Sequence, residues 1–173
     1  MITGRPLFTT EQINDKVAEL AQAISRDYAG REVLAIGILK GAFMFFADLI
    51  RALKLPVTVD FMVASSYFKT ASTGNTTLHY EPRENVKGMH VLLIDDIIDT
   101  GVSLNYIREM LLAREPSSLK ICVLLDKKER RLVDVPVDYL GFKIPNEFVV
   151  GYGLDYENRY RNLPYIAVFK KET

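Results

Sequence analysis

The stretch VLLIDDIIDTGVSL, from Val91 to Leu104, joins a run of apolar residues to three carboxylates and a glycine. Its first part lies in MHVLLID, which is short and apolar, as is typical of a buried strand. Asp95, Asp96 and Asp99 follow, and the segment SLNYIREMLLA behind them is amphipathic, as in a helix that packs on a sheet. We therefore predict a strand, an acidic turn and a helix that begins near Ser103.

The start of this predicted helix is suited to bind phosphate. Thr100–Ser103 would present backbone N–H groups at a helix N-terminus, where the helix dipole also favours an anion. The carboxylates repel phosphate, but they suit hydroxyl groups, a cation or a positively charged transition state. Together these groups predict a site for a sugar phosphate. The alternative is a plain acidic turn in which one Asp caps the helix, and this explains one acid better than three.

Two common phosphate-binding loops are missing from the sequence. It contains no GxxxxGK[ST] loop, and no GxGxxG follows a predicted strand. Nucleoside triphosphatases and dinucleotide-binding enzymes of the usual kinds depend on these loops. Both classes of function are therefore disfavoured.

Strands and helices alternate along the rest of the chain. Apolar residues recur at helical spacing from Thr10 to Asp27, and Thr9 with Gln12 can form a capping box before them. Val33–Leu39 is β-branched and apolar on both faces, as in a buried parallel strand. The other predicted elements are a helix over 42–53 and strands over 57–66, 119–125, 137–144 and 164–169. We predict a single α/β domain over residues 1–173, with a mostly parallel twisted sheet flanked by helices.

Ligands bind beyond the carboxyl ends of the strands in such a sheet. That edge would receive Lys40-Gly41, the acids from Asp95 onward and the segment after Leu125. It would also receive the polar stretch SYFKTASTGNTTLH, residues 66–79, which we predict to be a long loop that acts as a lid or binding loop. All of these segments are charged, polar or contain glycine, as a ligand site requires.

Composition and charge narrow the class of protein. The 173 residues include 22 Lys and Arg against 22 Asp and Glu, which argues against a general nucleic-acid binder. The N-terminus lacks the apolar core of a signal peptide, and no apolar run approaches the ~18 residues of a membrane span. We therefore expect a cytoplasmic protein. The single cysteine, Cys122, is expected to be a small buried apolar residue.

The stretch Asp95–Gly101 resembles the motif by which type I phosphoribosyltransferases bind phosphoribosyl pyrophosphate (PRPP). Three further segments resemble hypoxanthine-guanine phosphoribosyltransferases, namely LKGAFMFFADL, SSYFKTASTG and VDYLGFKIPNEFVVGYGLDYENRYRNLPYI. The resemblance covers most of the chain from Val33 onward, with the motifs in the expected order. It implies the type I phosphoribosyltransferase fold, with a small base-binding hood contributed mainly by the C-terminal segment.

The resemblance also implies a reaction and its partners. A 6-oxopurine (hypoxanthine or guanine) and PRPP give IMP or GMP and pyrophosphate, with Mg²⁺ as the cofactor. Neither a nucleic acid nor a membrane is expected as a partner, and relatives form homodimers or homotetramers. Two alternatives stay open: a xanthine-preferring variant, and a regulator of the same fold that senses nucleotides or binds RNA.

Individual roles follow from the same resemblance. Asp95 and Asp96 match the acids that hold the ribose hydroxyls, and Asp99 matches the candidate general base near N7 of the purine. The remaining matches are PRPP binding by Lys40, Gly41, Thr100, Gly101, Ser103 and Arg161, a lid with Ser66 and Tyr67, purine binding by Lys127, Phe148 and Val149, magnesium binding by Asp155, and a further basic position at Arg131. The peptide in the loop at Lys40 is commonly cis in the family. The chain departs from its relatives at Asp95, where they usually carry the longer Glu.

Lys127 also has a physical argument of its own. An ammonium group donates hydrogen bonds and cannot accept them. It therefore suits the O6 atom of hypoxanthine or guanine and not the amino group of adenine. The competing interpretation is that Lys127 is solvated surface, because it lies in the charged run DKKERR.

Overall fold

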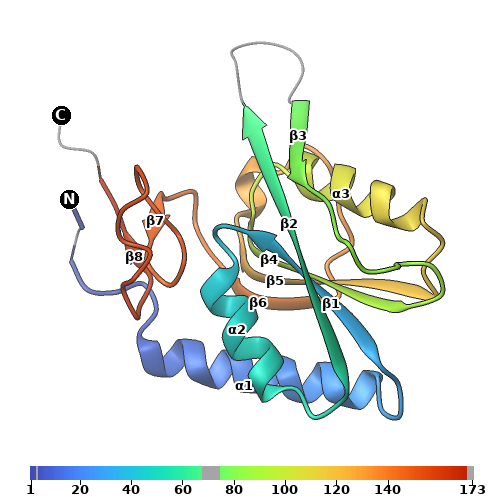
Figure 1. Cartoon of the computed structure of the whole chain (residues 1–173). Coiled ribbons are helices and arrows are strands. Elements are labelled where there is room, and N and C mark those ends of the chain that lie inside the picture. Colours follow the sequence, from blue (N-terminus) through green and yellow to red (C-terminus); the bar gives the residue numbers. More distant parts are fainter. Residues whose placement is uncertain (3, 68–74, 171–173) are drawn as a thin grey trace.

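The strand that carries the acidic stretch, β4, lies in the middle of a six-stranded sheet (Figure 1). The computed structural model describes residues 1–2, 4–67 and 75–170, and its strands follow the order β3-β2-β1-β4-β5-β6. Neighbouring strands are parallel except β2 and β3, which confirms the predicted α/β class. The strands are β1 (Val33–Leu39), β2 (Val57–Tyr67), β3 (Asn75–Tyr80), β4 (His90–Ile98), β5 (Ser118–Asp126) and β6 (Tyr139–Lys143).

Helices cover both faces of this sheet (Figure 1). The helices α1 (Thr10–Asp27) and α2 (Phe43–Ala52) pack over one apolar core, and α3 (Val102–Leu112) packs over a second core on the other face. Successive residues of a strand point to opposite faces, so β1 contributes Ala35 to the first core and Ile36 to the second. This explains why β1 is apolar along its whole length.

Local sequence explains where α1 begins and how α2 docks. The Thr9 hydroxyl accepts a hydrogen bond from the Gln12 N–H at 3.3 Å, and the Thr9 N–H donates to the Gln12 side chain at 2.9 Å, so the predicted capping box is confirmed. On β1, a Cβ at Gly37 would lie 2.7 Å from the ring of Phe46. The close approach of α2 to the sheet therefore depends on this glycine.

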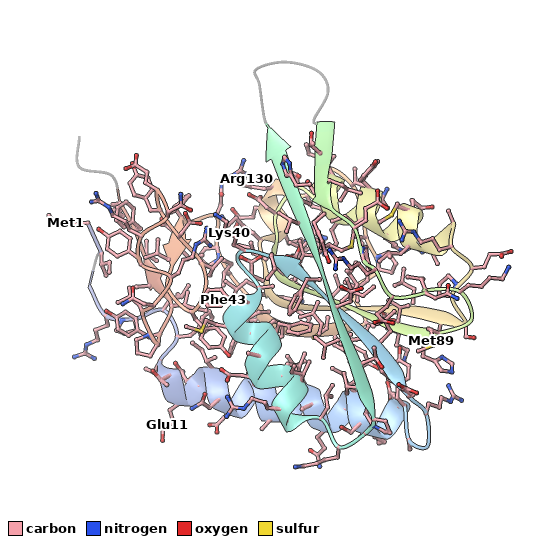
Figure 2. The ribbon with its side chains drawn as sticks, viewed as in Figure 1. Met1, Glu11, Lys40, Phe43, Met89 and Arg130 are labelled. Atoms are coloured by element: carbon pink, nitrogen blue, oxygen red, sulfur yellow. The ribbon has the colours of Figure 1, made fainter. Side chains whose placement is uncertain are left out.

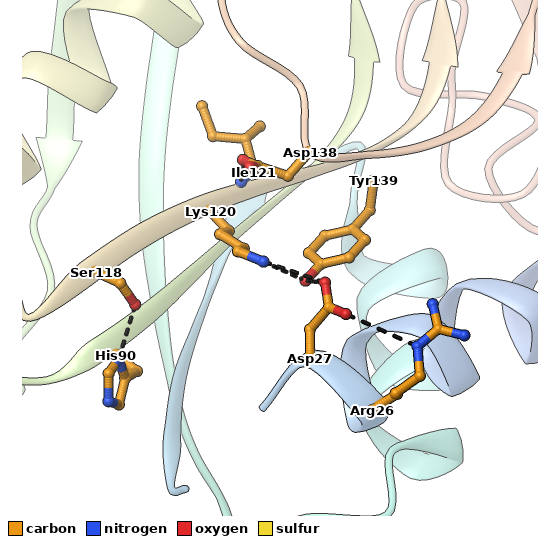
Figure 3. A network of polar contacts seen from close by, with 8 residues as sticks. All are labelled: Arg26, Asp27, His90, Ser118, Lys120, Ile121, Asp138 and Tyr139. Atoms are coloured by element: carbon orange, nitrogen blue, oxygen red, sulfur yellow. Dashed lines mark hydrogen bonds and ion pairs between the residues drawn. The ribbon is translucent and has the colours of Figure 1, made fainter. Parts of the chain in front are cut away.

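A polar network ties the end of α1 to β5 and β6 (Figure 3). The Tyr139 hydroxyl donates to the Asp27 carboxylate at 2.8 Å, and Lys120 donates to the same carboxylate at 3.1 Å. These two hydrogen bonds, Tyr139 first, lower the pKa of Asp27. The network lies toward the amino ends of the strands, so it anchors α1 at the edge of the sheet opposite the predicted site.

Residues 148–169, called the hood below, lie beside the main sheet (Figure 1). The hood strands β7 (Val149–Val150) and β8 (Ala167–Val168) pair antiparallel. The N-terminal segment joins them through bridges from Ile2 to Phe169 and from Phe8 to Ile166. Both ends of the chain therefore take part in the hood. The strand predicted over 164–169 is limited to β8, and β7 is not among the predicted elements.

Two segments differ from the prediction. β4 continues to Ile98, so Asp95 and Asp96 lie in the strand, with Asp95 opposite Val123, and not in a turn. The prediction of one long loop over 66–79 is wrong at both ends, because β2 continues to Tyr67 and Asn75–Tyr80 pairs with it as β3. The middle of that stretch, 68–74, lies outside the described residues. Strand pairing satisfies the backbone groups and needs no apolar side chains, which is why polar sequence can extend both strands.

Two smaller expectations concern Cys122 and membrane spans. Cys122 is fully buried in β5, as expected for a small apolar residue, and burial raises the pKa of its thiol. Across the described ranges, no helix combines the length and the apolar character needed to cross a bilayer.

Candidate active site

A cavity of about 440 Å³ opens between the carboxyl edge of the main sheet and the hood. Figure 2 labels Lys40 and Arg130 in this region, between the hood and the long strand β2. A cavity of this size suits a small-molecule ligand. The predicted site residues among its lining are Lys40, Gly41, Asp95, Asp96, Asp99, Ser103, Lys127, Phe148, Val149, Asp155 and Arg161.

Two acids lie side by side at the floor of this cavity. Asp95 and Asp96 are half-buried at the end of β4. Each carboxylate accepts a hydrogen bond from the next backbone N–H, Asp96 N at 3.0 Å and Ile97 N at 2.9 Å. Burial, followed by the charge of Asp96, raises the pKa of Asp95 well above its ordinary value, and burial also raises the pKa of Asp96. Burial therefore makes it costly for both carboxylates to be charged, and a cation or hydroxyl donors would reduce this cost.

We expect Asp95→Asn to raise the thermal stability of the unliganded protein. The pKa of Asp95 is raised in the folded state, so the folded state loses stability as the pH rises through that pKa. Asn removes this loss, and each kcal/mol gained corresponds to about 2–4 °C in Tm for a chain of this size. Calorimetry at pH 7.5 should show the gain, and the gain should shrink as the pH falls toward the ordinary Asp value of ~3.9.

Asp134 provides the matched control for this change. It is exposed and belongs to none of the ion pairs of the described residues. Asp134→Asn should change the free energy of unfolding by no more than about ±0.5 kcal/mol, as ordinary surface substitutions do. This corresponds to a change in Tm of about 1–2 °C. A Tm for Asp95→Asn equal to or below that of the parent protein would contradict the account of the acid pair.

The loop after β1 is packed tightly against this acid pair. The peptide between Leu39 and Lys40 is cis, as the resemblance implies. A Cβ on Gly41 would lie 1.7 Å from Oδ2 of Asp96, and a Cβ on Gly153 of the hood would lie 2.2 Å from the Gly41 carbonyl oxygen. The Lys40-Gly41 loop is therefore held between the strand acids and the hood, and a larger residue at Gly41 requires the Asp96 side chain to move.

Gly41→Ala should disable the site through the displacement of Asp96. A shift of about 1 Å in a positioned group commonly costs about 100-fold in rate, so we expect at least that loss in kcat/KM for the reaction proposed below. Steady-state assays measure it. Gly30→Ala is the control, because that glycine has φ +74° but no atom within 4 Å of its Cβ position. Gly30→Ala should lower the stability of the protein and leave kcat/KM unchanged. Equal kcat/KM values for Gly41→Ala and the parent protein would refute the packing argument.

The turn between β4 and α3 places a glycine at the start of α3. Gly101 is the N-cap at φ +83°, so the alternative of an Asp cap is wrong, and the Val102 N–H donates to Thr100 Oγ1 at 3.4 Å. A Cβ on Gly101 would lie 2.3 Å from the Val133 carbonyl oxygen, which explains the glycine. Thr100 and Gly101 lie outside the lining of the main cavity. They line an adjoining hollow of about 190 Å³, together with Asp99 and Ser103, which line both.

Asp99 and Lys127 face the cavity from the ends of β4 and β5. Asp99 Oδ2 pairs with Arg130 Nη1 at 3.2 Å, while Asp99 Oδ1 is buried and has no hydrogen-bond partner among the described residues. The side chain of Lys127 is buried, with the residue only 6% exposed, so its interpretation as solvated surface is wrong. Burial lowers the pKa of Lys127, and the nearby charge of Asp99 opposes that shift.

The hood supplies an aromatic ring and an ion pair. Phe148 is 50% exposed, and its ring meets Tyr156 edge-on with 5.9 Å between ring centroids. Val149 behind it is buried in β7. Asp155 Oδ1 pairs with Arg161 Nη2 at 2.7 Å, and Arg161 Nη1 donates to the Gly153 carbonyl at 2.6 Å. The cavity thus has an exposed ring on one side and a fixed cation beside an acid on another.

Three predicted residues remain, Ser66, Tyr67 and Arg131. Ser66 and Tyr67 end β2, and only their backbone is described. Arg131 Nε donates to the Asp99 carbonyl at 3.1 Å, and its guanidinium pairs with Asp126. Arg130 is the residue that the sequence analysis missed. Its position could have indicated a role, because it lies in the segment after Leu125, and ligands bind beyond the carboxyl ends of parallel strands.

The chain is similar to proteins of one family over nearly its whole length. The pattern of the phosphoribosyl transferase domain family matches residues 7–157. The hypoxanthine-guanine phosphoribosyltransferase of Streptococcus pneumoniae is 46% identical over 167 residues, which is 96% of this chain and 93% of that protein. The hypoxanthine phosphoribosyltransferase of Salmonella typhimurium is 50% identical over 159 residues, 90% of this chain and 89% of that protein.

A solved structure shows the same similarity in three dimensions. A crystal structure of a hypoxanthine-guanine phosphoribosyltransferase from Bacillus anthracis superimposes with a TM-score of 0.94. It is 46% identical in sequence, and the match covers 98% of this chain and all of that chain. At this identity and coverage, the likeness extends to the sheet, the helices and the hood together.

Proposed function

Since the chain belongs to the phosphoribosyl transferase family, we propose that it is a purine-salvage enzyme that moves the 5-phosphoribosyl group from PRPP to hypoxanthine or guanine. Relatives that are 46–50% identical carry the names hypoxanthine and hypoxanthine-guanine phosphoribosyltransferase. One observation of the structure supports this most: Asp99, the buried Lys127 and the exposed ring of Phe148 line one cavity together with the acid pair of β4. Base-binding and sugar-binding groups are thus side by side.

The sugar phosphate is assigned to the β4–α3 side of the cavity. Asp95 and Asp96 accept hydrogen bonds from the ribose hydroxyls, which supply the donors that this acid pair needs. The 5′-phosphate binds at the N-terminus of α3, near Thr100, Gly101 and Ser103, because backbone N–H groups and the helix dipole favour an anion there. The N-cap residue, Gly101, has no side chain to occupy this place, and the one side-chain acceptor found there among the described residues, Thr100 Oγ1, is 3.4 Å from the Val102 nitrogen.

The purine is assigned to the space between the hood and the end of β5. The ring of Phe148 stacks on the base, and the backbone of Val149 contacts its edge. Lys127 donates to O6 of the purine. Asp99 accepts the proton from N7 as the new bond to the ribose forms.

The leaving pyrophosphate is assigned to Lys40, Gly41 and Arg161. The bond from the ribose C1 to pyrophosphate breaks while the bond from C1 to the purine forms, and positive charge develops on the sugar, as in other glycosyl transfers. Lys40 and Arg161 stabilise the negative charge on pyrophosphate, and the acids beneath the sugar stabilise the positive charge. In this assignment, the cations act on the negative leaving group and the acids act on the positive sugar.

The donor set of the cavity fits magnesium. No cluster of three His, Cys, Asp or Glu side chains occurs within the described part of the chain, but Mg²⁺ is commonly held by one or two carboxylates and the phosphates of its substrate. Asp155 would hold it, in the same cavity as Asp95 and Asp96, whose pKa values burial raises. When bound, Mg²⁺ would neutralise charge on the phosphates.

Three finer assignments belong to the same proposal. Ser66 and Tyr67 act in a lid, since they lie at the carboxyl end of β2. The enzyme is cytoplasmic and forms a homodimer or a homotetramer, as the resemblance implies. Arg131 acts from outside the cavity, through the Asp99 carbonyl that it contacts.

An absorbance assay with PRPP and Mg²⁺ tests the proposal. Hypoxanthine, guanine, xanthine, adenine and uracil are offered in turn, and turnover of hypoxanthine or guanine is expected. A preference for xanthine would change the proposed substrate but not the proposed mechanism. Failure to turn over any purine, with PRPP and Mg²⁺ saturating, would defeat the enzymatic proposal and favour a nucleotide-sensing regulator.

A further inference from the structure

Arg130 contacts the carboxylate that is proposed to receive the purine proton. It ends the short 3-10 helix η1 (Lys128–Arg130), and its Nη1 lies 3.2 Å from Oδ2 of Asp99. The other oxygen, Oδ1 of Asp99, is buried and has no hydrogen-bond partner within the described ranges. One oxygen of the carboxylate is thus held by a cation, and the other is enclosed by the protein, so the orientation of the side chain is fixed by Arg130.

The backbone on both sides of this contact is fixed. Arg131 Nε donates to the Asp99 carbonyl at 3.1 Å. The N–H groups of Leu132 and Val133 donate to the Thr100 carbonyl at 2.9 and 3.0 Å. Residues 130–133 are therefore bound to the β4–α3 turn along their length. This attachment keeps Arg130 beside Asp99, although the two are distant in the sequence.

Arg130 is outside the cavity, whereas Asp99 and Lys127 line it. The lining of the cavity includes Asp99 and Lys127 but not Arg130. The guanidinium is half exposed and reaches the edge of the site only through the carboxylate. Its contact with the residues that line the cavity is therefore the ion pair with Asp99, and its positive charge also contributes to lowering the pKa of Lys127.

Asp99 interacts with two cations, with Arg130 in an ion pair and with Lys127 through its charge. Its charge also acts on Lys127, since it opposes the lowering of the Lys127 pKa by burial. An Asp carboxylate rotates readily about its last torsion. Without Arg130, the carboxylate would turn toward Lys127 and pair with the ammonium group that is assigned to the purine O6. A carboxylate that is not within hydrogen-bond distance of the proton cannot act as the general base.

We propose that Arg130 is a positioning residue, which holds Oδ2 of Asp99 so that the carboxylate stays in its place at the cavity and does not pair with Lys127. This inference rests on the proposed function. It assigns a task to a residue in the charged run DKKERR that would otherwise count as solvated surface. Arg130 is not a catalytic residue, because it touches no reacting atom.

The test begins with Arg130→Gln, which keeps the length of a polar side chain and removes the charge. We expect kcat with hypoxanthine to fall about 10- to 100-fold, as for a group displaced by about 1 Å, with KM for PRPP within about twofold of the parent value. Arg130→Lys should recover part of the loss. Lys128→Gln is the control, because Lys128 is an exposed cation of the same turn and takes part in none of the ion pairs of the described residues; it should match the parent protein.

Single-turnover rates of Arg130→Gln in the Asp99→Asn background distinguish positioning from a general structural effect. Positioning predicts little further loss there, because the carboxylate that Arg130 holds is already gone. An equal loss in both backgrounds would overturn the inference, as would an unchanged kcat in the single variant or a raised KM for PRPP with kcat intact. If the parent protein transfers no phosphoribosyl group, the proposed function fails. If it does and Arg130→Gln matches it, only this inference fails.

Discussion

Adenine is expected to be a very poor substrate, with kcat/KM up to ~10⁴-fold below that for hypoxanthine. The reason is Lys127, whose ammonium group donates and does not accept. The residue is 6% exposed, so water does not replace a missing hydrogen bond there. The amino group of adenine would face a second donor in a buried place, and both groups would stay unpaired. Initial rates with the two bases at saturating PRPP measure the ratio.

Lys127→Met tests whether this residue carries the discrimination. Met keeps an unbranched chain and removes the charge, so hypoxanthine should lose efficiency while adenine changes little. Lys128→Met, the same change at an exposed neighbour, should keep the full ratio. The discrimination should weaken as the pH rises and Lys127 loses its proton. Because burial lowers the pKa of Lys127, this loss should begin at a lower pH than for an ordinary lysine. Comparable turnover of adenine and hypoxanthine by the parent protein would refute the assigned role of Lys127.

Asp99→Asn is expected to lower kcat with hypoxanthine by 100-fold or more, in the range of about 10²–10⁴-fold for the loss of a general base. Asn has nearly the same size as Asp. The β4–α3 turn, and the hydrogen bonds that the Thr100 carbonyl accepts from Leu132 and Val133, should therefore persist. Its amide does not take a proton, although its oxygen still accepts a hydrogen bond. The transfer step should therefore slow while PRPP still binds.

Two measurements separate these effects. Rapid-mixing experiments give the rate of the transfer step, and titration calorimetry gives the affinity for PRPP with Mg²⁺, which should stay within about threefold of the parent value, or ~0.7 kcal/mol. Asp134→Asn makes the same change at an exposed acid and should leave both quantities unaltered. If kcat is unchanged in Asp99→Asn, Asp99 is not the base. If PRPP binding is lost along with kcat, the variant has damaged the turn and not only the proton transfer.

Elements whose local sequence signals agree were predictable. α1 was expected from Thr10 to Asp27 and lies there, because the apolar spacing and the Thr9–Gln12 capping box agree on its start. β1 was likewise expected over Val33–Leu39, because a strand buried on both faces is apolar throughout. Parallel α/β topology then follows from the alternation of such elements, so the edge that holds the cavity was predictable as well.

Elements defined by pairing between distant segments were not predictable in the same way. β3 is polar and belongs to the sheet only because β2 lies beside it. β7 consists of Val149 and Val150, too few residues for any periodic signal, and its partner β8 lies at the other end of the hood. Asp95 and Asp96 are in a strand because β5 extends equally far. Pairing over such distances is decided by tertiary structure and not by local propensity.

The same distinction holds for the site. Its members were predicted by family resemblance, and the cavity brings most of them together. What the sequence did not reveal is electrostatic and steric: the burial of Lys127, the raised pKa of Asp95, and the ion pair between Arg130 and Asp99. Each depends on distances between side chains from different elements, which no spacing along the chain encodes.

The measurement that tests the central claim most directly is ³¹P NMR of a mixture of the protein, PRPP, Mg²⁺ and hypoxanthine. Phosphoribosyl transfer to the base predicts that the PRPP signals disappear while pyrophosphate and a nucleoside monophosphate appear in equal amounts, and that omission of hypoxanthine stops the change. Persistent PRPP signals, or pyrophosphate formed with ribose phosphate while hypoxanthine stays unchanged, would contradict the account.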